Sequence, residues 1–161
     1  MIRKYLKYFK IQTVDVLIYY LDKSLLFDFE TQDYIVKKRK MDNKKICFSI
    51  SVDGKVIHES YLYNRTFILR LINKKGPTIG DCKTIEGYRG KAIYPFVINY
   101  IAKQEILSNN IKEVFIIVNS DNASSIKGIE KAGFKMHTRI KTKKFLLFYF
   151  KVNKLSNLEK T

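Results

Sequence analysis

The pattern of apolar and polar positions predicts a chain that mixes strands with helices. In the first half, β-branched and aromatic residues mark the strands, which are expected at Val14–Leu21, Lys44–Ser51, Lys55–Tyr63 and Phe67–Ile72. Asp53-Gly54 separates two of them, and this dipeptide between apolar runs is typical of a β-hairpin, because glycine accepts the positive φ of a tight turn. Residues 31–45 are polar and give no assignment.

The second half alternates strands with helices. The expected strands are Thr78–Ile85, Val114–Val118, which is apolar enough to be buried on both faces, and a closing antiparallel pair, Lys135–Thr142 with Phe145–Val152. A helical run with Pro95 near its start, where no N–H is needed, includes Ile93 and is expected to end near Ser108-Asn109-Asn110. A second helix is expected from the N-cap Asn122 to about Ala132, with Gly133 ending it.

The two ends of the chain differ from the middle. Apolar residues at helical spacing among basic ones predict a short basic amphipathic helix within residues 1–12. A helix packed on the domain edge is the favoured interpretation, and a surface anchor on anionic lipid is the alternative. Residues 153–161 are expected as a frayed polar tail. The predicted fold class is α/β, or mixed α+β, with residues 1–152 forming a single domain.

Charge and cysteine content narrow the classes of function. The chain has 31 Lys+Arg against 15 Asp+Glu, a net charge of +16. This net charge predicts an anionic partner: nucleic acid, an acidic membrane face or a phosphorylated small molecule. The longest apolar run, Phe145–Phe150, is far too short for a membrane span and is expected in the core. No signal peptide is evident, so we expect a cytoplasmic protein, and two distant cysteines and two isolated histidines predict neither a disulfide framework nor a metal site.

The segment Gly87–Tyr94 carries the strongest chemical signal. It lies between an expected strand and an expected helix, where small residues leave backbone N–H groups accessible and the helix start is electropositive. Arg89 and Lys91 add full positive charges, so the segment fits a pyrophosphate. Its glycine spacing matches neither a Walker A loop nor a dinucleotide fingerprint. A tight turn with solvated basic residues is the alternative.

Two motifs resemble the GNAT superfamily of acyl-CoA N-acyltransferases. Tyr88–Ile93 resembles its acyl-CoA signature, Arg/Gln-x-x-Gly-x-Gly/Ala. The stretch from Asn119 to Phe134 resembles its Asn-x-x-Ala-x-x-x-Tyr-x-Lys-x-Gly-Phe helix, and the resemblance covers about Thr78–Val152. It implies a GNAT fold: a central, mostly antiparallel sheet splayed between its fourth and fifth strands and flanked by helices. It also implies acetyl-CoA as cosubstrate and no metal.

The resemblance implies which residues contact acetyl-CoA. The backbone of Cys82 and Thr84, on the fourth strand, would face the pantetheine arm, with Asn122 and Ser125 beside it. The backbone N–H groups that would bind the pyrophosphate belong to Arg89, Gly90, Lys91, Ala92, Ile93 and Tyr94. Cys82 also raises the idea of a nucleophile, although a small apolar filler in the sheet is the favoured interpretation.

One departure from the family pattern concerns the proton donor. Ile129 stands where many members have a tyrosine that protonates the leaving thiolate, and isoleucine has no proton to give. Tyr94 and Tyr88 are the candidate replacements, with solvent as the alternative. Tyr94 also replaces a small residue of the acyl-CoA signature.

The candidate bases lie on the strands. His58 is preferred because imidazole titrates near neutral pH, and Glu59 next to it would face the other side of the sheet. Asp81 is the second candidate. The alternatives are a hydrogen-bonded edge histidine for His58 and an ion pair with a lysine for Asp81.

The leading hypothesis is an acetyl-CoA-dependent N-acetyltransferase that acts directly on a primary amine. The motifs resemble those of bacterial acetyltransferases of surface-polysaccharide synthesis, which implies an amino sugar on a nucleotide carrier as acceptor. A basic nucleic-acid-binding protein is one alternative, although the lysines are dispersed and no helix-turn-helix or RNP pattern occurs. A GNAT domain that binds acyl-CoA without catalysis is the other.

Overall fold

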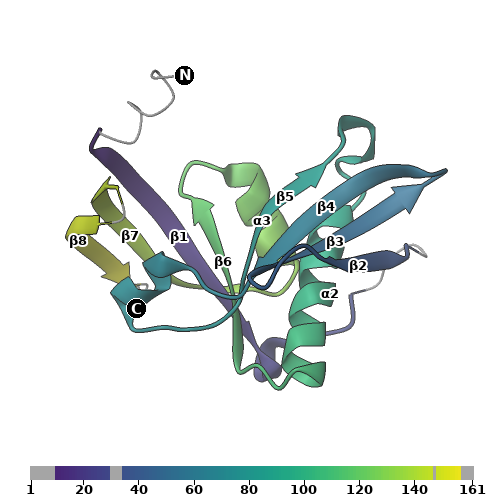
Figure 1. The fold of residues 1–161 in the computed structure, drawn as a ribbon, viewed down its shortest axis with the longest axis horizontal. Helices are drawn as coiled ribbons and strands as arrows, with labels where there is room; N and C mark the ends of the chain where they lie inside the picture. Colours follow the sequence, from purple (N-terminus) through teal and green to yellow (C-terminus); the bar gives the residue numbers. More distant parts are fainter. Residues whose placement is uncertain (1–9, 30–33, 147, 157–161) are drawn as a thin grey trace.

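The computed structural model describes residues 10–29, 34–146 and 148–156. Its centre is an eight-stranded sheet in the order β2-β3-β4-β5-β6-β1-β7-β8 (Figure 1). The strands are β1 (Gln12–Asp22), β2 (Val36–Lys40), β3 (Lys45–Val52), β4 (Lys55–Tyr63), β5 (Thr78–Thr84), β6 (Glu113–Asn119), β7 (Lys135–Phe145) and β8 (Phe148–Ser156). The helices are α2 (Ile93–Ser108) and α3 (Ala123–Lys131), with 3-10 helices η2 (Lys23–Leu25), η3 (Phe67–Ile72) and η4 (Glu86–Tyr88).

The sheet is antiparallel except at one place. β5 and β6 run parallel, and they pair only where Thr78 meets Phe115 and Ile79 meets Ile116. Beyond those pairs the two strands diverge (Figure 1), which leaves backbone groups on both facing edges without a strand partner. The mixed α+β class and the splayed sheet are confirmed. The splayed strands are the fifth and sixth in the chain, because the short strand β2 precedes them.

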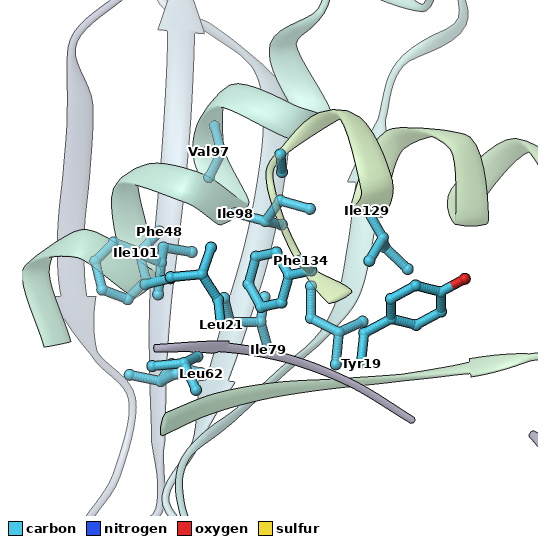
Figure 2. Close-up of a cluster of buried hydrophobic side chains, with 14 of the residues drawn as sticks. Tyr19, Leu21, Phe48, Leu62, Ile79, Val97, Ile98, Ile101, Ile129 and Phe134 are labelled. Carbon is cyan, nitrogen blue, oxygen red and sulfur yellow. The ribbon is translucent and has the colours of Figure 1, made fainter. Parts of the chain in front are cut away.

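Two apolar clusters hold the layers together. Figure 2 shows the larger one, in which α2 and α3 cover one face of the sheet; its labelled members are Tyr19, Leu21, Phe48, Leu62, Ile79, Val97, Ile98, Ile101, Ile129 and Phe134. A buried side chain of this size contributes roughly 1.5–3 kcal/mol to folding. On the opposite face, η3 supplies Ile68 and Leu69 to a second cluster with β1, β6 and β7.

Local chemistry accounts for several element boundaries. Asp53 and Gly54 have φ values of 50° and 75°, as a tight hairpin between β3 and β4 requires. The Asn122 side chain accepts a hydrogen bond from the Ser125 N–H at 3.2 Å and so caps α3. Gly133 ends that helix with a φ of 90°. These three expectations are confirmed.

Other expectations need correction. Phe67–Ile72 is the 3-10 helix η3 and not a strand, because Ile68 and Leu69 side by side fill the second cluster. Within residues 31–45, which gave no assignment, residues 36–40 form the lysine-rich edge strand β2. Residues 153–156 belong to β8 rather than to a frayed tail.

The ends of the chain bear on two further expectations. The helix expected within residues 1–12 falls mainly on residues 1–9, outside the described part, and Gln12 already belongs to β1. Within the described ranges, no helix combines the length and the apolar character needed to cross a bilayer.

Candidate functional site

Two adjoining cavities lie where β5 and β6 diverge. Their volumes are about 670 Å³ and about 260 Å³, and both are lined by Cys82, Tyr94, Asn122 and Ser125. We therefore treat them as one site, the wedge groove. The larger cavity is lined by Cys82, Lys83, Thr84, Tyr88, Arg89, Gly90, Ala92, Ile93, Tyr94, Pro95, Asn122, Ser124, Ser125, Lys127, Gly128 and Lys131. The smaller cavity extends to Asp81 and along β6.

The turn that leads into α2 presents free donors to the larger cavity. Ala92, the residue that precedes α2, has a φ of 57° and offers no side-chain cap, and Gly90 has a φ of 78°. The first backbone bond of the helix runs from the Phe96 N–H to the Ala92 carbonyl at 3.1 Å. In the described structure, no hydrogen bond engages the N–H groups of residues 90–94. The Arg89 N–H, which was expected to act with them, instead donates to the Glu86 carbonyl at 3.1 Å and is not free. These N–H groups and the helix dipole together favour an anion.

The charged side chains around this turn have one sign. Lys83, Arg89, Lys127 and Lys131 line the larger cavity, and its lining includes no Asp or Glu. The Arg89 Nε donates to the Thr84 carbonyl at 3.2 Å, which ties the turn to the end of β5. This part of the groove suits a ligand with several phosphate charges.

The wedge groove brings together nine of the ten residues expected to bind the cofactor. The tenth, Lys91, does not line either cavity, and its Nζ lies 4.7 Å from the centre of the Tyr88 ring. One face of α3, formed by Ser124, Lys127, Gly128 and Lys131, also lines the larger cavity and was not among the predicted site residues. Their spacing of three or four residues was the signal that would have revealed them. Cofactor contact by these residues stays a prediction.

The side-chain amide of Asn122 uses its oxygen in the helix cap and not its nitrogen. Its side-chain oxygen is used by α3, where it accepts from the Ser125 N–H and from the Ser124 hydroxyl, both at 3.2 Å. Its amide nitrogen has no partner among the described residues. The cap therefore fixes the side-chain amide of a residue that lines both cavities and leaves its amide nitrogen as a donor.

β5 contains a β-bulge at Asp81 and Cys82. Glu59 pairs with Lys83 and Tyr61 pairs with Gly80, so β5 has one extra residue between them. Asp81 lies in this bulge with a φ of 49°. Its exposed side chain accepts a hydrogen bond from the Tyr63 hydroxyl, and the Lys45 Nζ lies 3.8 Å away.

Cys82, the next residue, lines the groove. Burial raises the pKa of its thiol to about 12, with the Ser60 hydroxyl partly offsetting the effect. At neutral pH the thiol is therefore protonated, which favours a filler over a nucleophile.

His58 lies behind the groove wall and not in it. It is 1% exposed, and its ring nitrogens lie 2.7 Å from the hydroxyl oxygens of Thr84 and Ser60. Burial lowers its pKa to about 4. The expectation that the His58 imidazole titrates near neutral pH is therefore wrong. Its catalytic role stays a prediction, and any proton exchange with a ligand would pass through a neighbouring hydroxyl.

Tyr94 is the phenol that both cavities share. Its ring packs against α3 at Gly128, and burial raises the pKa of its hydroxyl, so the hydroxyl keeps its proton at neutral pH. Ile129, the neighbour of Gly128, is 0% exposed and belongs to the core. The groove therefore has a tyrosine from α2 at the place where α3 offers none.

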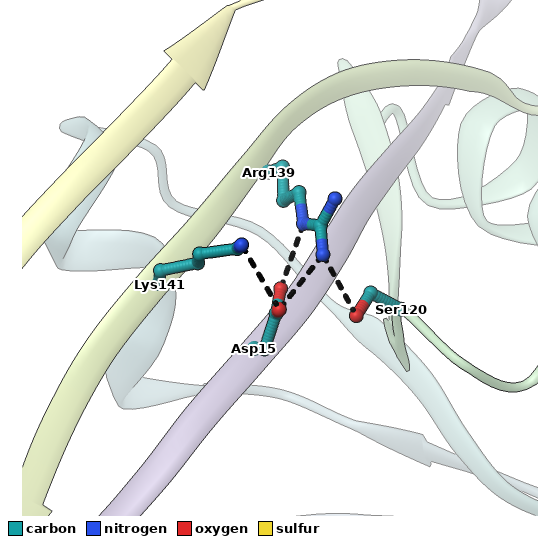
Figure 3. Close-up of polar contacts among 4 residues, drawn as sticks. All are labelled: Asp15, Ser120, Arg139 and Lys141. Atoms are coloured by element: carbon teal, nitrogen blue, oxygen red, sulfur yellow. Dashed lines mark hydrogen bonds and ion pairs between the residues drawn. The ribbon is translucent and has the colours of Figure 1, made fainter.

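An ion-pair cluster holds the loop that leads from β6 to α3 (Figure 3). The Arg139 guanidinium donates to both Asp15 carboxylate oxygens at 2.8 Å and to the Ser120 hydroxyl at 3.3 Å. The Ser120 N–H donates to the Asp15 carbonyl at 3.1 Å. Asp15 on β1 and Arg139 on β7 thus fix the loop two residues before Asn122.

Comparison with known proteins identifies the fold. No family model and no curated protein matches the chain. A GNAT-family acetyltransferase from Colwellia psychrerythraea matches with 16% identity and a TM-score of 0.57, covering 84% of this chain and 57% of that one. A structure from Novosphingobium aromaticivorans, assigned to the GNAT family, matches with 12% identity and a TM-score of 0.58, covering 82% and 64%. The chain has the GNAT fold, and it spans less than two thirds of either matched chain.

Proposed function

We propose that this protein is an acetyl-CoA-dependent N-acetyltransferase. The observation that carries the proposal is the wedge groove, in which unpaired strand edges lead to the free N–H groups of residues 90–94. Unpaired edges accept a ligand that carries amides, and a helix start accepts its phosphates. Acetyl-CoA has both parts and would supply a thioester as acetyl donor. The GNAT fold of the chain supports this assignment.

The residues of the groove have distinct roles in this proposal. The edge of β5 around Cys82 and Thr84 pairs with the pantetheine arm, and the free amide of Asn122 donates to it. Residues 90–94 bind the pyrophosphate through their N–H groups. Lys127 and Lys131 neutralise further phosphate charge from α3, which fits their position on the lining of the larger cavity.

Proton transfer needs a donor and an acceptor on either side of the reacting carbonyl. Tyr94 is the donor, because its hydroxyl is protonated at neutral pH and its side chain lines both cavities. Of the two predicted bases, Asp81 lines the groove and His58 does not. We therefore assign Asp81 the role of the base that takes the proton from the acceptor amine. His58 supports the groove wall through its contacts with the hydroxyl groups of Thr84 and Ser60.

The acceptor in this proposal is a primary amine, and an amino sugar on a nucleotide carrier is the preferred class. Such an acceptor is anionic, and the net charge of +16 would raise its local concentration. The test mixes the protein with acetyl-CoA and UDP- or dTDP-linked amino sugars and follows thiol release. Release above that with simple amines, peptides or buffer supports this acceptor class. Equal release with all of them contradicts it.

A domain that binds acyl-CoA without catalysis is the second candidate. The observation in its favour is Ile129, which places a buried aliphatic side chain where the resembled motif has a tyrosine. Acetyl-CoA that raises the melting temperature, with no thiol release across a broad amine panel, would favour this candidate. Thiol release that depends on Tyr94 would exclude it.

A further inference from the structure

The hairpin of β7 and β8 ends in an exposed apolar tip. Ile11, Leu146 and Phe148 are 60%, 42% and 73% exposed. Gln12 pairs with Lys144 and Phe145 pairs with Phe148, so the residue before β1 lies beside the hairpin turn. The run Phe145–Phe150 was expected in the core. For Leu146 and Phe148 this expectation is wrong, because Leu146 lies in the turn after β7 and Phe148 begins β8, the last strand of the sheet.

Three lysines are neighbours of these apolar side chains in the sequence or across the pairing of β1 with β7. Lys10 and Lys143 are exposed and Lys144 is half-buried, and together with Ile11, Leu146 and Phe148 they form what we call the hairpin tip. The sequence from residue 135 to residue 156 has seven Lys or Arg and no Asp or Glu. The hairpin thus holds nearly half of the surplus charge of +16.

The Asp15 carboxylate on β1 does not neutralise the positive charge of the hairpin. Asp15 is held by Arg139 at 2.8 Å, and Lys141 lies 3.7 Å from it. These partners lower the pKa of Asp15 to about 2, so it is already paired and charged at neutral pH. No ion pair joins Lys10, Lys143 or Lys144 to a carboxylate in the described ranges, so these lysines are available there to an external anion.

We propose that the hairpin tip docks on an anionic lipid bilayer. Exposed apolar side chains with lysines beside them in the chain match the two components of such a surface: an apolar interior and negatively charged headgroups. The lysine stems extend along apolar surface while their ammonium groups reach the headgroups. Duplex nucleic acid fits less well, because phosphate and groove contacts give the aliphatic side chains Ile11 and Leu146 no partner.

The geometry leaves the wedge groove accessible during docking. The groove is bounded by β5, β6, α2 and α3, whereas the tip is formed by the start of β1 and the turn between β7 and β8. Figure 1 shows the β7–β8 hairpin on the far side of β1 from β5 and α2. A docked protein can therefore still bind a soluble donor.

Tryptophan fluorescence tests whether the tip enters the bilayer. The chain has no tryptophan, so Phe148→Trp introduces one reporter at the tip, and Ile35→Trp places a matched reporter at another exposed apolar position, beside β2 at the opposite sheet edge. Vesicles of phosphatidylcholine mixed with phosphatidylglycerol should shift the F148W emission to the blue, and brominated lipid should quench it. Phosphatidylcholine alone should do neither, and the I35W emission should stay unchanged.

Charge variants provide the second arm of the test. In vesicle co-sedimentation, Lys143→Glu with Lys144→Glu should weaken binding about tenfold or more, while Lys37→Glu with Lys40→Glu on β2 should not. The proposal would be overturned by equal loss with both pairs, by binding to duplex DNA without binding to anionic vesicles, or by no F148W shift with those vesicles. A blue shift that grows with protein concentration in lipid-free buffer would instead identify a contact between two copies and would also overturn it.

Discussion

The Tyr94 ring fills the space that a side chain at Gly128 would need. A Cβ at position 128 would lie 2.5 Å from Cδ1 and 2.7 Å from Cε1 of that ring. The smallest residue of α3 therefore lies at the point where the tyrosine of α2 crosses it. In this protein the phenol that both cavities share comes from α2, and Ile129, the next residue of α3 after Gly128, packs in the core.

Tyr94→Phe tests the proton donor. The ring still fills the space at Gly128, so acetyl-CoA affinity should change little, while kcat should fall about a hundredfold or more through loss of the general acid. Steady-state kinetics and calorimetric titration measure the two effects separately. Tyr88→Phe is the control and should keep its kcat. An unchanged kcat in Y94F would assign protonation of the thiolate to solvent.

Gly128→Ala tests the contact itself. Alanine raises intrinsic helix propensity by about 1 kcal/mol, yet the new Cβ must displace the Tyr94 ring. We expect lower kcat, weaker acetyl-CoA binding and no rise in melting temperature. Gly87→Ala is the matched control, because a Cβ there meets nothing within 4 Å. A G128A variant that is more stable and fully active would show that the ring does not need this space.

Lys127→Ala and Lys131→Ala test the basic face of α3. Each should raise the Kd of coenzyme A about threefold to tenfold at low ionic strength, because each removes a charge that faces the phosphates. The effect should shrink as salt is added. Lys112→Ala removes an exposed lysine outside the groove and should leave the Kd unchanged. Equal effects at all three positions would assign the binding to net charge alone.

The sequence predicted those features that depend on local chemistry. The hairpin at Asp53-Gly54, the Asn122 cap and the turn around Gly90 each need particular residues at particular positions, so short patterns revealed them. The burial of His58 could not be predicted, because it depends on α2 and β5 closing over β4. Neither could the exposure of Phe148, which follows from the place of β8 at the sheet edge. An apolar run such as Phe67–Ile72 fits a strand and a short helix equally well, because the choice depends on how the run packs against the sheet face opposite α2 and α3.

His58 should make the fold sensitive to acid. Its pKa is about 4 in the folded state against 6.5 for an unperturbed histidine, so the unfolded state binds the proton more tightly. The free energy of unfolding should therefore fall as the pH drops from 6.5 towards 4, by about 3 kcal/mol in total. Urea denaturation across this range measures the slope.

His58→Gln separates this effect from other titrations. The variant should lose most of the slope, whereas His137→Gln should keep most of it, although burial lowers the pKa of His137 as well. Asp15 contributes at lower pH, because its pKa lies near 2 in the folded state. An H58Q variant with the slope of the parent protein would show that His58 is not the titrating group.

Arg139→Met tests the cluster that holds the loop between β6 and α3. Loss of the guanidinium leaves Asp15 and Ser120 without their shared donor, so the loop that carries Asn122 should loosen. We expect a lower melting temperature and a higher Kd for coenzyme A, with kcat at saturation nearly unchanged. Arg70→Met is a control, because Arg70 stacks on Phe67 away from the groove. A rise in Kd of equal size in both variants would contradict a local role.

Amide chemical-shift mapping with coenzyme A tests the central claim most directly. In a 15N-labelled protein, the resonances of residues 90–94 should shift most on addition of coenzyme A, because their N–H groups are free donors at the start of α2. The edge of β5 around Cys82 and the side-chain amide of Asn122 should shift with them. Resonances of β2 and β3 should stay in place. Saturating coenzyme A that leaves residues 90–94 unperturbed, or that perturbs only residues outside the wedge groove, would contradict the proposed function.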